Sequence, residues 1–208
     1  MMDASRELKE QWAQLGPVVD QLIIMTGTAR DAFNRHHRQL VTDLNQQQED
    51  LAQKINAVGG QLENLLPKKS GSEKSALLQL HSILSHLSVI GDNLAQLSEP
   101  LQKKIQGAVL FSDKAVAQTN YLFDHQAGIL RSLVDIVHTD NAYLKKYVVE
   151  EGQKMLQACL EFATEHEARL IEGLCLPQAG PIFLAILDRM RTITQHESEI
   201  VNILTKKS

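Results

Sequence analysis

The sequence predicts an all-α protein made of two tandem antiparallel three-helix bundles. Apolar residues recur at spacings of three and four along the chain, most regularly from Leu77 to Leu97, while the alternation typical of a strand is nowhere sustained. The two halves of the chain also share one apolar pattern. With 208 residues, 43% hydrophobic and 22% charged, the chain is long and apolar enough to bury a continuous core.

Glycines, prolines and polar clusters divide the chain into six main helices, expected to within a few residues. A lead-in over residues 1–17 ends at Gly16-Pro17, and the first helix follows over 18–38. The second, 39–66, stops at the polar segment PKKSGSE, and the third, 73–105, carries the apolar stripe. The fourth, 110–138, ends before Thr139-Asp140, the fifth spans 140–174, and the sixth, 181–204, follows the segment LPQAGP.

An internal repeat is predicted from the match between the halves at an offset of 103 or 104 residues. The apolar residues of the third helix fall on apolar residues of the sixth: Leu80, Ile83, Leu84, Leu87 and Ile90 on Phe183, Ile186, Leu187, Met190 and Ile193. Any two amphipathic helices can be slid until their stripes agree, but here nearly the same offset serves three consecutive helices. We therefore expect one repeat over 18–106 and a second over 107–208.

Composition excludes several classes of protein. The net charge of −4 and the low aromatic content of 4% argue against a nucleic-acid-binding protein. Cys159 and Cys175 lie sixteen positions apart in one predicted helix, too far apart for a disulfide. No apolar run reaches the roughly 20 residues that span a bilayer, and the start of the chain is charged. The expected location is cytoplasmic.

No catalytic motif is found in the sequence. The eight histidines form no HExxH pattern, and no Gly-x-Ser-x-Gly elbow is present. Asp135 and His138 have the spacing used in four-helix di-iron proteins, but one such pair is insufficient for that site. Glu165 and Arg169 are read as a helix-stabilising ion pair. We predict that the chain is not an enzyme.

One short segment carries a family resemblance. The third helix contains SVIGDNL, from Ser88 to Leu94, and the corresponding position of the sixth reads RTITQHE, from Arg191 to Glu197. Two tandem three-helix units whose third helices carry a Glu-Arg-Ile-Gly-Asp-like signature resemble the PhoU family of phosphate-transport regulators. The resemblance covers nearly the whole chain from about Val18, and it implies the family's helical fold.

The resemblance also implies a surface metal site, made by two acids four residues apart in each signature. Residues at i and i+4 share a helical face, so two carboxylates can converge on a cation. Here those positions hold Ser88 and Asp92 in the first repeat and Arg191 and Gln195 in the second, so one carboxylate of four remains. We therefore predict that the metal site is degenerate and that the chain binds no metal or other cofactor there. Asp92 is a weak candidate ligand, and the four signature positions, Ser88, Asp92, Arg191 and Gln195, are candidate surface interaction sites. Gly91 is interpreted as a close-packing residue between helices.

The function implied by the resemblance is that of a non-enzymatic regulator of phosphate transport or phosphate signalling. Its expected partner is a membrane phosphate transporter or a phosphate-sensing kinase, and homodimerisation stays open. Lysine pairs at predicted helix ends complement helix dipoles or, if they share a face, allow peripheral association with the inner membrane: Lys68-Lys69, Lys103-Lys104, Lys145-Lys146 and Lys206-Lys207. The alternatives are a generic helical adaptor or oligomerisation module, and the soluble domain of a sodium–phosphate cotransporter.

Overall fold

The computed structural model describes residues 10–205, which are almost entirely helical and contain no strand. The predicted all-α fold class is thereby confirmed. Residues 10–13 of the predicted lead-in are helical, while residues 1–9 and the lysine pair at 206–207 lie outside the described part. The helices are α2 (Leu15–Arg35), α3 (Arg38–Leu65), the short 3-10 helix η1 (Leu66–Lys68), α4 (Gly71–Gln96), α5 (Ser98–Gln106), α6 (Asp113–Thr139), α7 (Ala142–Ile171) and α8 (Ala179–Thr205).

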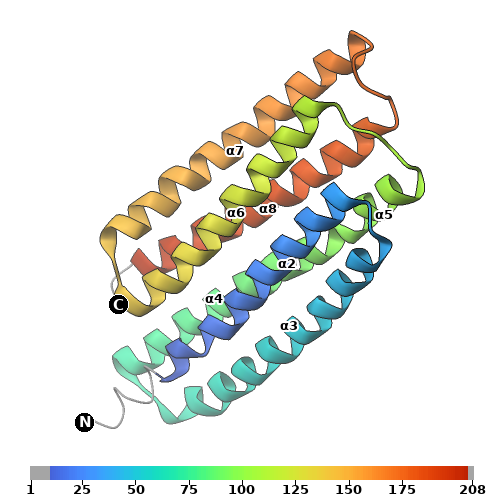
Figure 1. Ribbon diagram of the computed structural model, residues 1–208. Coiled ribbons are helices and arrows are strands. Elements are labelled where there is room, and N and C mark those ends of the chain that lie inside the picture. Colours follow the sequence, from blue (N-terminus) through green and yellow to red (C-terminus); the bar gives the residue numbers. More distant parts are fainter. Residues whose placement is uncertain (1–9, 206–208) are drawn as a thin grey trace.

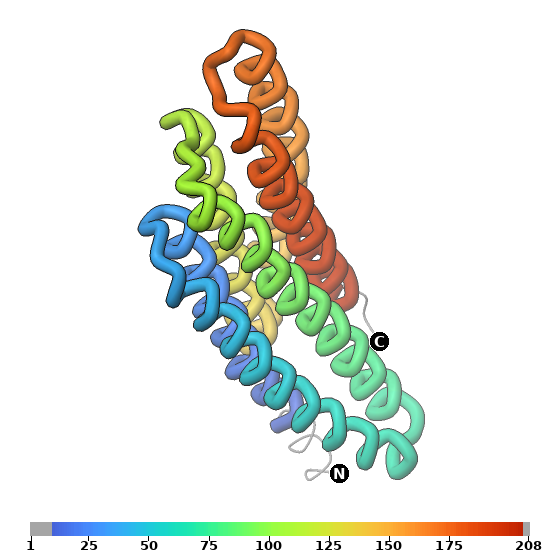
Figure 2. The backbone as a smooth tube through the Cα atoms, turned by 90° about the vertical axis from the view of Figure 1, so that its right-hand side faces the viewer, coloured from blue at the N-terminus to red at the C-terminus, as the bar shows by residue number. Residues whose placement is uncertain are grey.

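The long helices lie side by side and form an elongated bundle (Figures 1 and 2). α2, α3 and α4 contact one another, as do α6, α7 and α8. The two groups meet where α2 packs on α6 and α4 packs on α8, and the partners in each of these contacts run in opposite directions (Figure 1). The predicted repeat boundary at 106/107 falls between α5 and α6. The division into repeats stays a prediction, which superposing 18–105 on 110–204 with Ile90 on Ile193 would test.

Two prolines place helix boundaries differently from the sequence prediction. The helix expected over 73–105 is interrupted at Leu97, giving α4 and α5. Pro100 lacks the N–H that would bond to the carbonyl of Gln96, so the helical ladder cannot continue unbroken there. At the other boundary, α2 begins at Leu15 and not after Pro17, because proline is tolerated in the first turn of a helix, where its missing N–H has no partner.

The core follows the apolar stripes. Leu84, Leu87, Leu187 and Met190 are each at most 4% exposed, as the helical spacing predicts. The bulkiest fully buried side chains include Phe33, Phe123 and Phe183. Both cysteines are free thiols. Among the helices between residues 10 and 205, none combines the length and the apolar character needed to cross a membrane.

Candidate functional site

The signature positions lie on the outer faces of α4 and α8. Asp92, Arg191 and Gln195 are exposed, and Ser88 is half-buried. The structure thus places each pair of predicted site residues on one helical face, beside the buried stripe of its own helix. It does not bring the two pairs together into one cluster: within residues 10–205, no three His, Cys, Asp or Glu side chains form a group that could hold a metal ion.

In the first signature, the single carboxylate has a neutral partner. Gln48, on α3, donates its Nε2–H to Oδ1 of Asp92 over 2.6 Å. The amide therefore occupies one oxygen of the carboxylate and ties α4 to α3. Ser88, one turn earlier, contributes a hydroxyl where the resemblance implies a second acid. The pair can bind through hydrogen bonds, but it supplies one negative charge where a hard cation prefers several.

In the second signature, the local charge is balanced by an ion pair. Nη2 of Arg191 lies 2.9 Å from Oδ1 of Asp188, one turn earlier on α8. Both side chains are about half exposed, so this pair contributes little to stability. A guanidinium at this position repels cations, and Gln195 adds no charge. The site is suited to recognising a polar or acidic surface rather than a metal ion.

Gly91, inside the first signature, allows α3 and α4 to pack closely. A Cβ built on it would lie 2.1 Å from Cδ2 of Leu51 and 3.4 Å from Cδ2 of Leu22. Both leucines are fully buried, so neither has room to move away. The structure therefore confirms the interpretation of this glycine as a packing residue.

A buried carboxyl group lies next to the second signature. Glu197 is 1% exposed, and neither of its oxygens has a hydrogen-bond partner. Its polar neighbour is Gln126 of α6, which is fully buried and whose Nε2 is also unpartnered; Thr194 donates to the Oε1 of that amide over 3.4 Å. Burial raises the pKa of Glu197 well above its ordinary value, and the Gln126 amide opposes this in part. Burial in the core of the second group of helices thus favours the protonated form of this acid.

Sequence reasoning missed this acid as a buried group, although a signal is present. At the repeat offset, Glu197 corresponds to Leu94 and Gln126 to Leu22. A polar residue at a position of the apolar stripe is the feature that could have identified it. Buried polar groups without partners are costly and are rarely found by chance.

Two side-chain pairs connect α4 with α8. Nδ1 of His86 lies 2.8 Å from Nδ1 of His196, and Arg189 donates to Oδ1 of Asn93 over 3.4 Å. Burial lowers the pKa of His196, and a charge on His86 would lower it further. At least one of the two rings must be neutral, since one nitrogen has to accept the hydrogen bond. Sequence alone could not reveal these pairs, because their members lie about a hundred residues apart.

Lys104 is a further buried ionisable group. It is 3% exposed, donates to the carbonyl of Phe33 over 2.9 Å and contacts His36. Its Nζ also lies 4.8 Å from the Phe33 ring centre and 5.5 Å from that of Phe111. Desolvation lowers the pKa of Lys104 to about 8. The side chain caps the C-terminus of α2, where a cation complements the helix dipole.

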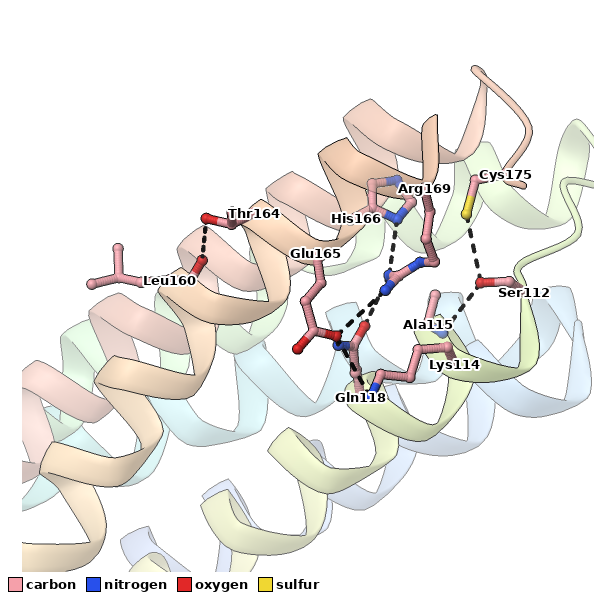
Figure 3. A network of polar contacts seen from close by, with 10 residues as sticks. All are labelled: Ser112, Lys114, Ala115, Gln118, Leu160, Thr164, Glu165, His166, Arg169 and Cys175. Atoms are coloured by element: carbon pink, nitrogen blue, oxygen red, sulfur yellow. Dashed lines mark hydrogen bonds and ion pairs between the residues drawn. The ribbon is translucent and has the colours of Figure 1, made fainter. Parts of the chain in front are cut away.

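A polar network joins α6 to the last turns of α7 (Figure 3). Gln118 donates to Oε2 of Glu165 over 2.9 Å and accepts from Nη2 of Arg169 over 3.0 Å. The predicted ion pair between Glu165 and Arg169 is present at 3.6 Å. His166 is buried beneath this network against the Phe183 ring, and burial, followed by the charge of Arg169, lowers its pKa. The network fixes the end of α7 to α6.

The described residues provide little for catalysis. Nδ1 of His125 contacts the buried carboxylate of Glu151, which also pairs with Lys154 at 3.2 Å. No hydroxyl or thiol in residues 10–205 is shown bonded to that imidazole. A pocket of about 240 Å³ lies between α3 and α5, lined by Arg38, Val41, Thr42, Asn45, Gln102, Ile105 and Gln106. It contains no acid–base pair.

Comparisons with known proteins show which fold this arrangement represents. No protein-family model and no curated protein sequence matches the chain. Among the crystal structures that match are those of the phosphate transport system regulatory protein PhoU from Streptococcus pneumoniae and of PhoU from Pseudomonas aeruginosa. The first has a TM-score of 0.86 at 13% identity and covers 97% of this chain and 94% of its own. The second has a TM-score of 0.84 at 11% identity, with 97% and 95% covered. The chain has the PhoU fold.

Proposed function

We propose that this protein is a non-enzymatic regulator of phosphate transport or phosphate signalling, acting by contact with a membrane phosphate transporter or a phosphate-sensing kinase. The observation that carries the proposal is the fold match, which extends over nearly the full length of both chains in each comparison. One of the matched proteins is a regulatory protein of a phosphate transport system. A helical bundle with polar outer faces is suited to binding, and we place it on the cytoplasmic side of the membrane.

The signature faces are the proposed contact surface. Asp92, Arg191 and Gln195 are exposed on α4 and α8; Arg191 is paired with Asp188, while the partner of Asp92 is the neutral amide of Gln48. Exposed polar side chains of this kind fix orientation and specificity at an interface. Reversing the charge at Asp92 and at Arg191 should weaken recovery of the partner. The matched control, Glu63→Arg on the exposed face of α3, should leave recovery unchanged.

Metal-independent regulation is the second part of the proposal. The carboxylate of Asp92 is bonded to an amide, and Arg191 places a cation where the resemblance implies an acid. Purified protein should carry little iron or zinc after dialysis. Restoring the acids with Ser88→Glu, Arg191→Glu and Gln195→Asp should clearly increase the bound metal, because it rebuilds both i, i+4 acid pairs. Near-stoichiometric metal in the unmodified protein would contradict this part.

The direct test of the partner is affinity purification of the tagged chain from cells grown with high and with low phosphate. After mild crosslinking, the bound proteins are identified by mass spectrometry. The proposal expects a phosphate transporter subunit or a sensor kinase, recovered in amounts that change with phosphate supply. Recovery of neither from phosphate-replete cells, with the bait folded and abundant, would count decisively against it.

A further inference from the structure

One end of the bundle displays a cluster of exposed aliphatic side chains. Leu110 is 67% exposed in the α5–α6 connection, Ile171 is 82% exposed at the end of α7, and Leu174 and Leu176 are 64% and 49% exposed in the α7–α8 connection. These four residues are termed the apolar tip. Single exposed leucines are common on protein surfaces, but several together indicate a binding surface.

The two connections that form the apolar tip lie against each other. Sγ of Cys175 lies 3.6 Å from Oγ of Ser112 (Figure 3). Leu174 and Leu176 flank that cysteine in the chain, and Leu110 precedes that serine by two residues. The connections that carry Leu110, Leu174 and Leu176 are therefore neighbours in the fold.

Polar contacts hold the apolar tip in place. The backbone N–H of Leu174 donates to the carbonyl of Arg169 over 2.8 Å. Gly173 has φ +73°, the left-handed conformation that ends a helix with little strain. Arg169 is itself bonded to Gln118 of α6. Leu174 and Leu176 thus lie in a turn that is held by hydrogen bonds, and they are exposed in the folded protein.

Three of the four residues of the apolar tip, Leu110, Leu174 and Leu176, lie in segments without charged side chains, whereas Ile171 is followed by the exposed Glu172. No Asp, Glu, Lys, Arg or His occurs between Glu172 and Asp188, or between Lys104 and Asp113. The connections at the opposite end of the bundle contain charged residues: Lys68 and Lys69 between α3 and α4, and Asp140 between α6 and α7. The α2–α3 connection, at the same end of the bundle as the apolar tip (Figure 1), carries the exposed residues His36 and His37. The lack of charge is therefore a property of the two connections that carry the leucines, not of that whole end.

We propose that the apolar tip inserts into the interfacial layer of a lipid bilayer. The α7–α8 connection projects beyond the neighbouring helix ends in both views (Figures 1 and 2). A projecting surface needs a receiving groove to bind a protein, but a bilayer accommodates it by deformation. Membrane insertion also demands an absence of charge, which a protein partner does not require and which residues 105–112 and 173–187 show.

The expected attachment is weak and reversible. A single fourteen-carbon acyl chain gives only marginal membrane binding, and stable anchoring takes two signals. Four partly exposed aliphatic side chains bury an apolar area of comparable order. The proposal deepens the proposed function, and rests on it for the second signal: the apolar tip would bring the chain to the membrane, and the transporter contact would retain it there.

Vesicle co-sedimentation tests the apolar tip without any protein partner. The full chain is mixed with phosphatidylcholine vesicles and with vesicles that also contain phosphatidylglycerol. The combined substitution Ile171→Ser, Leu174→Ser and Leu176→Ser should lower the partition constant at least about tenfold on both, since each tenfold corresponds to about 1.4 kcal/mol. The control is Leu78→Ser on α4, a leucine of similar exposure, 51%, away from the apolar tip; its partition should stay within about twofold of the unmodified chain.

Three outcomes would overturn the proposal: no vesicle binding by the unmodified chain, equal binding by the triple variant, or an equal loss caused by Leu78→Ser. Binding only to phosphatidylglycerol vesicles that disappears in high salt would also overturn it, since that behaviour requires charges the apolar tip lacks. Thermal unfolding followed by circular dichroism shows whether the variants are folded.

A second measurement needs no variant. Cys175 is half-buried, whereas Cys159 is buried and its pKa is raised by burial to about 11, so a thiol-reactive fluorophore labels Cys175 selectively. Vesicles should shift its emission to the blue, and brominated lipids should quench it. An unchanged spectrum would overturn the proposal. If the chain captures the partner but does not bind vesicles, the proposed function is unaffected and only the proposed membrane insertion of the apolar tip is refuted.

Discussion

Replacing Glu197 by leucine is expected to stabilise the protein. The carboxyl group is 1% exposed, and both oxygens lack a hydrogen-bond partner. Leu94 occupies the corresponding position of the first group of helices and is fully buried, so a leucine of similar size is compatible with this type of helix packing. The substitution removes a buried carboxyl group whose lost hydration is offset only in part, by the nearby Gln126 amide.

The magnitude follows from the lost hydration of that group. An orphaned buried polar group costs about 1–3 kcal/mol, and the leucine removes that cost while keeping apolar contact. A gain of 1 kcal/mol raises the melting temperature by about 2–4 °C in a protein of about 200 residues. We therefore expect Glu197→Leu to melt about 3–10 °C higher at neutral pH. Glu197→Gln should give a smaller gain, because the amide stays polar.

The pH dependence of this effect has a definite sign. The pKa of Glu197 is raised in the folded state, so the native protein holds a proton that the unfolded chain releases. The free energy of unfolding must then fall as pH rises from the unfolded pKa of about 4.5 toward the folded pKa. The stability gained by Glu197→Leu should accordingly be larger at pH 7 than at pH 4.

Urea unfolding at both pH values, followed by circular dichroism, measures these differences. Glu199→Leu, at an exposed position on the same helix, is the control and should change stability by less than about 0.5 kcal/mol. The reasoning is refuted if Glu197→Leu destabilises the protein, or if its effect equals that of the control at both pH values.

Three further predictions concern packing and protonation. Gly91→Ala should lower the free energy of unfolding by about 1–3 kcal/mol, because the added methyl group overpacks the core. Gly60→Ala, whose added Cβ would meet no atom within 4 Å, should raise it by about 0.5–1 kcal/mol. Denaturant midpoints distinguish the two variants, and a Gly91→Ala variant as stable as the unmodified protein would contradict the close packing. Leu87→Ala should cost about 2–5 kcal/mol and Asp92→Ala less than about 0.5 kcal/mol, as measured by urea unfolding, and equal costs would mean that the helical faces are assigned wrongly. Because the pKa of His196 is lowered, the stability that its neutral form contributes is present above the unfolded pKa of about 6.5 and is lost as pH falls. His196→Gln should therefore flatten the pH profile of the free energy of unfolding below pH 6.5, and an unchanged profile would argue against a lowered pKa of His196.

The sequence contains enough to predict the fold and the faces of the helices. The three-four spacing correctly places Leu84 and Leu87 inside and Asp92 outside, because helical periodicity alone determines which residues share a face. It predicts helix ends less well. The break at Leu97 depends on Pro100, four residues beyond the end of α4, and the start at Leu15 depends on Pro17, which the first turn accepts.

Buried polar groups could not be predicted to the same extent, because they depend on contacts between distant segments. Lys104 reads as a surface cation beside Lys103, yet it is buried, since the carbonyl at the end of α2 provides its acceptor. The His86–His196 pair depends on how α4 crosses α8. Only Glu197 left a local trace, as a polar residue at a position of the apolar stripe.

Phosphate uptake by living cells tests the central claim most directly. Uptake of radiolabelled phosphate is measured in phosphate-replete cells with the chromosomal copy intact, deleted, or restored on a plasmid. A regulator of phosphate transport should couple uptake to supply, so the deletion should alter the uptake rate under replete conditions and the plasmid copy should restore it. An uptake rate that is the same in all three strains, at both high and low phosphate, would contradict the account.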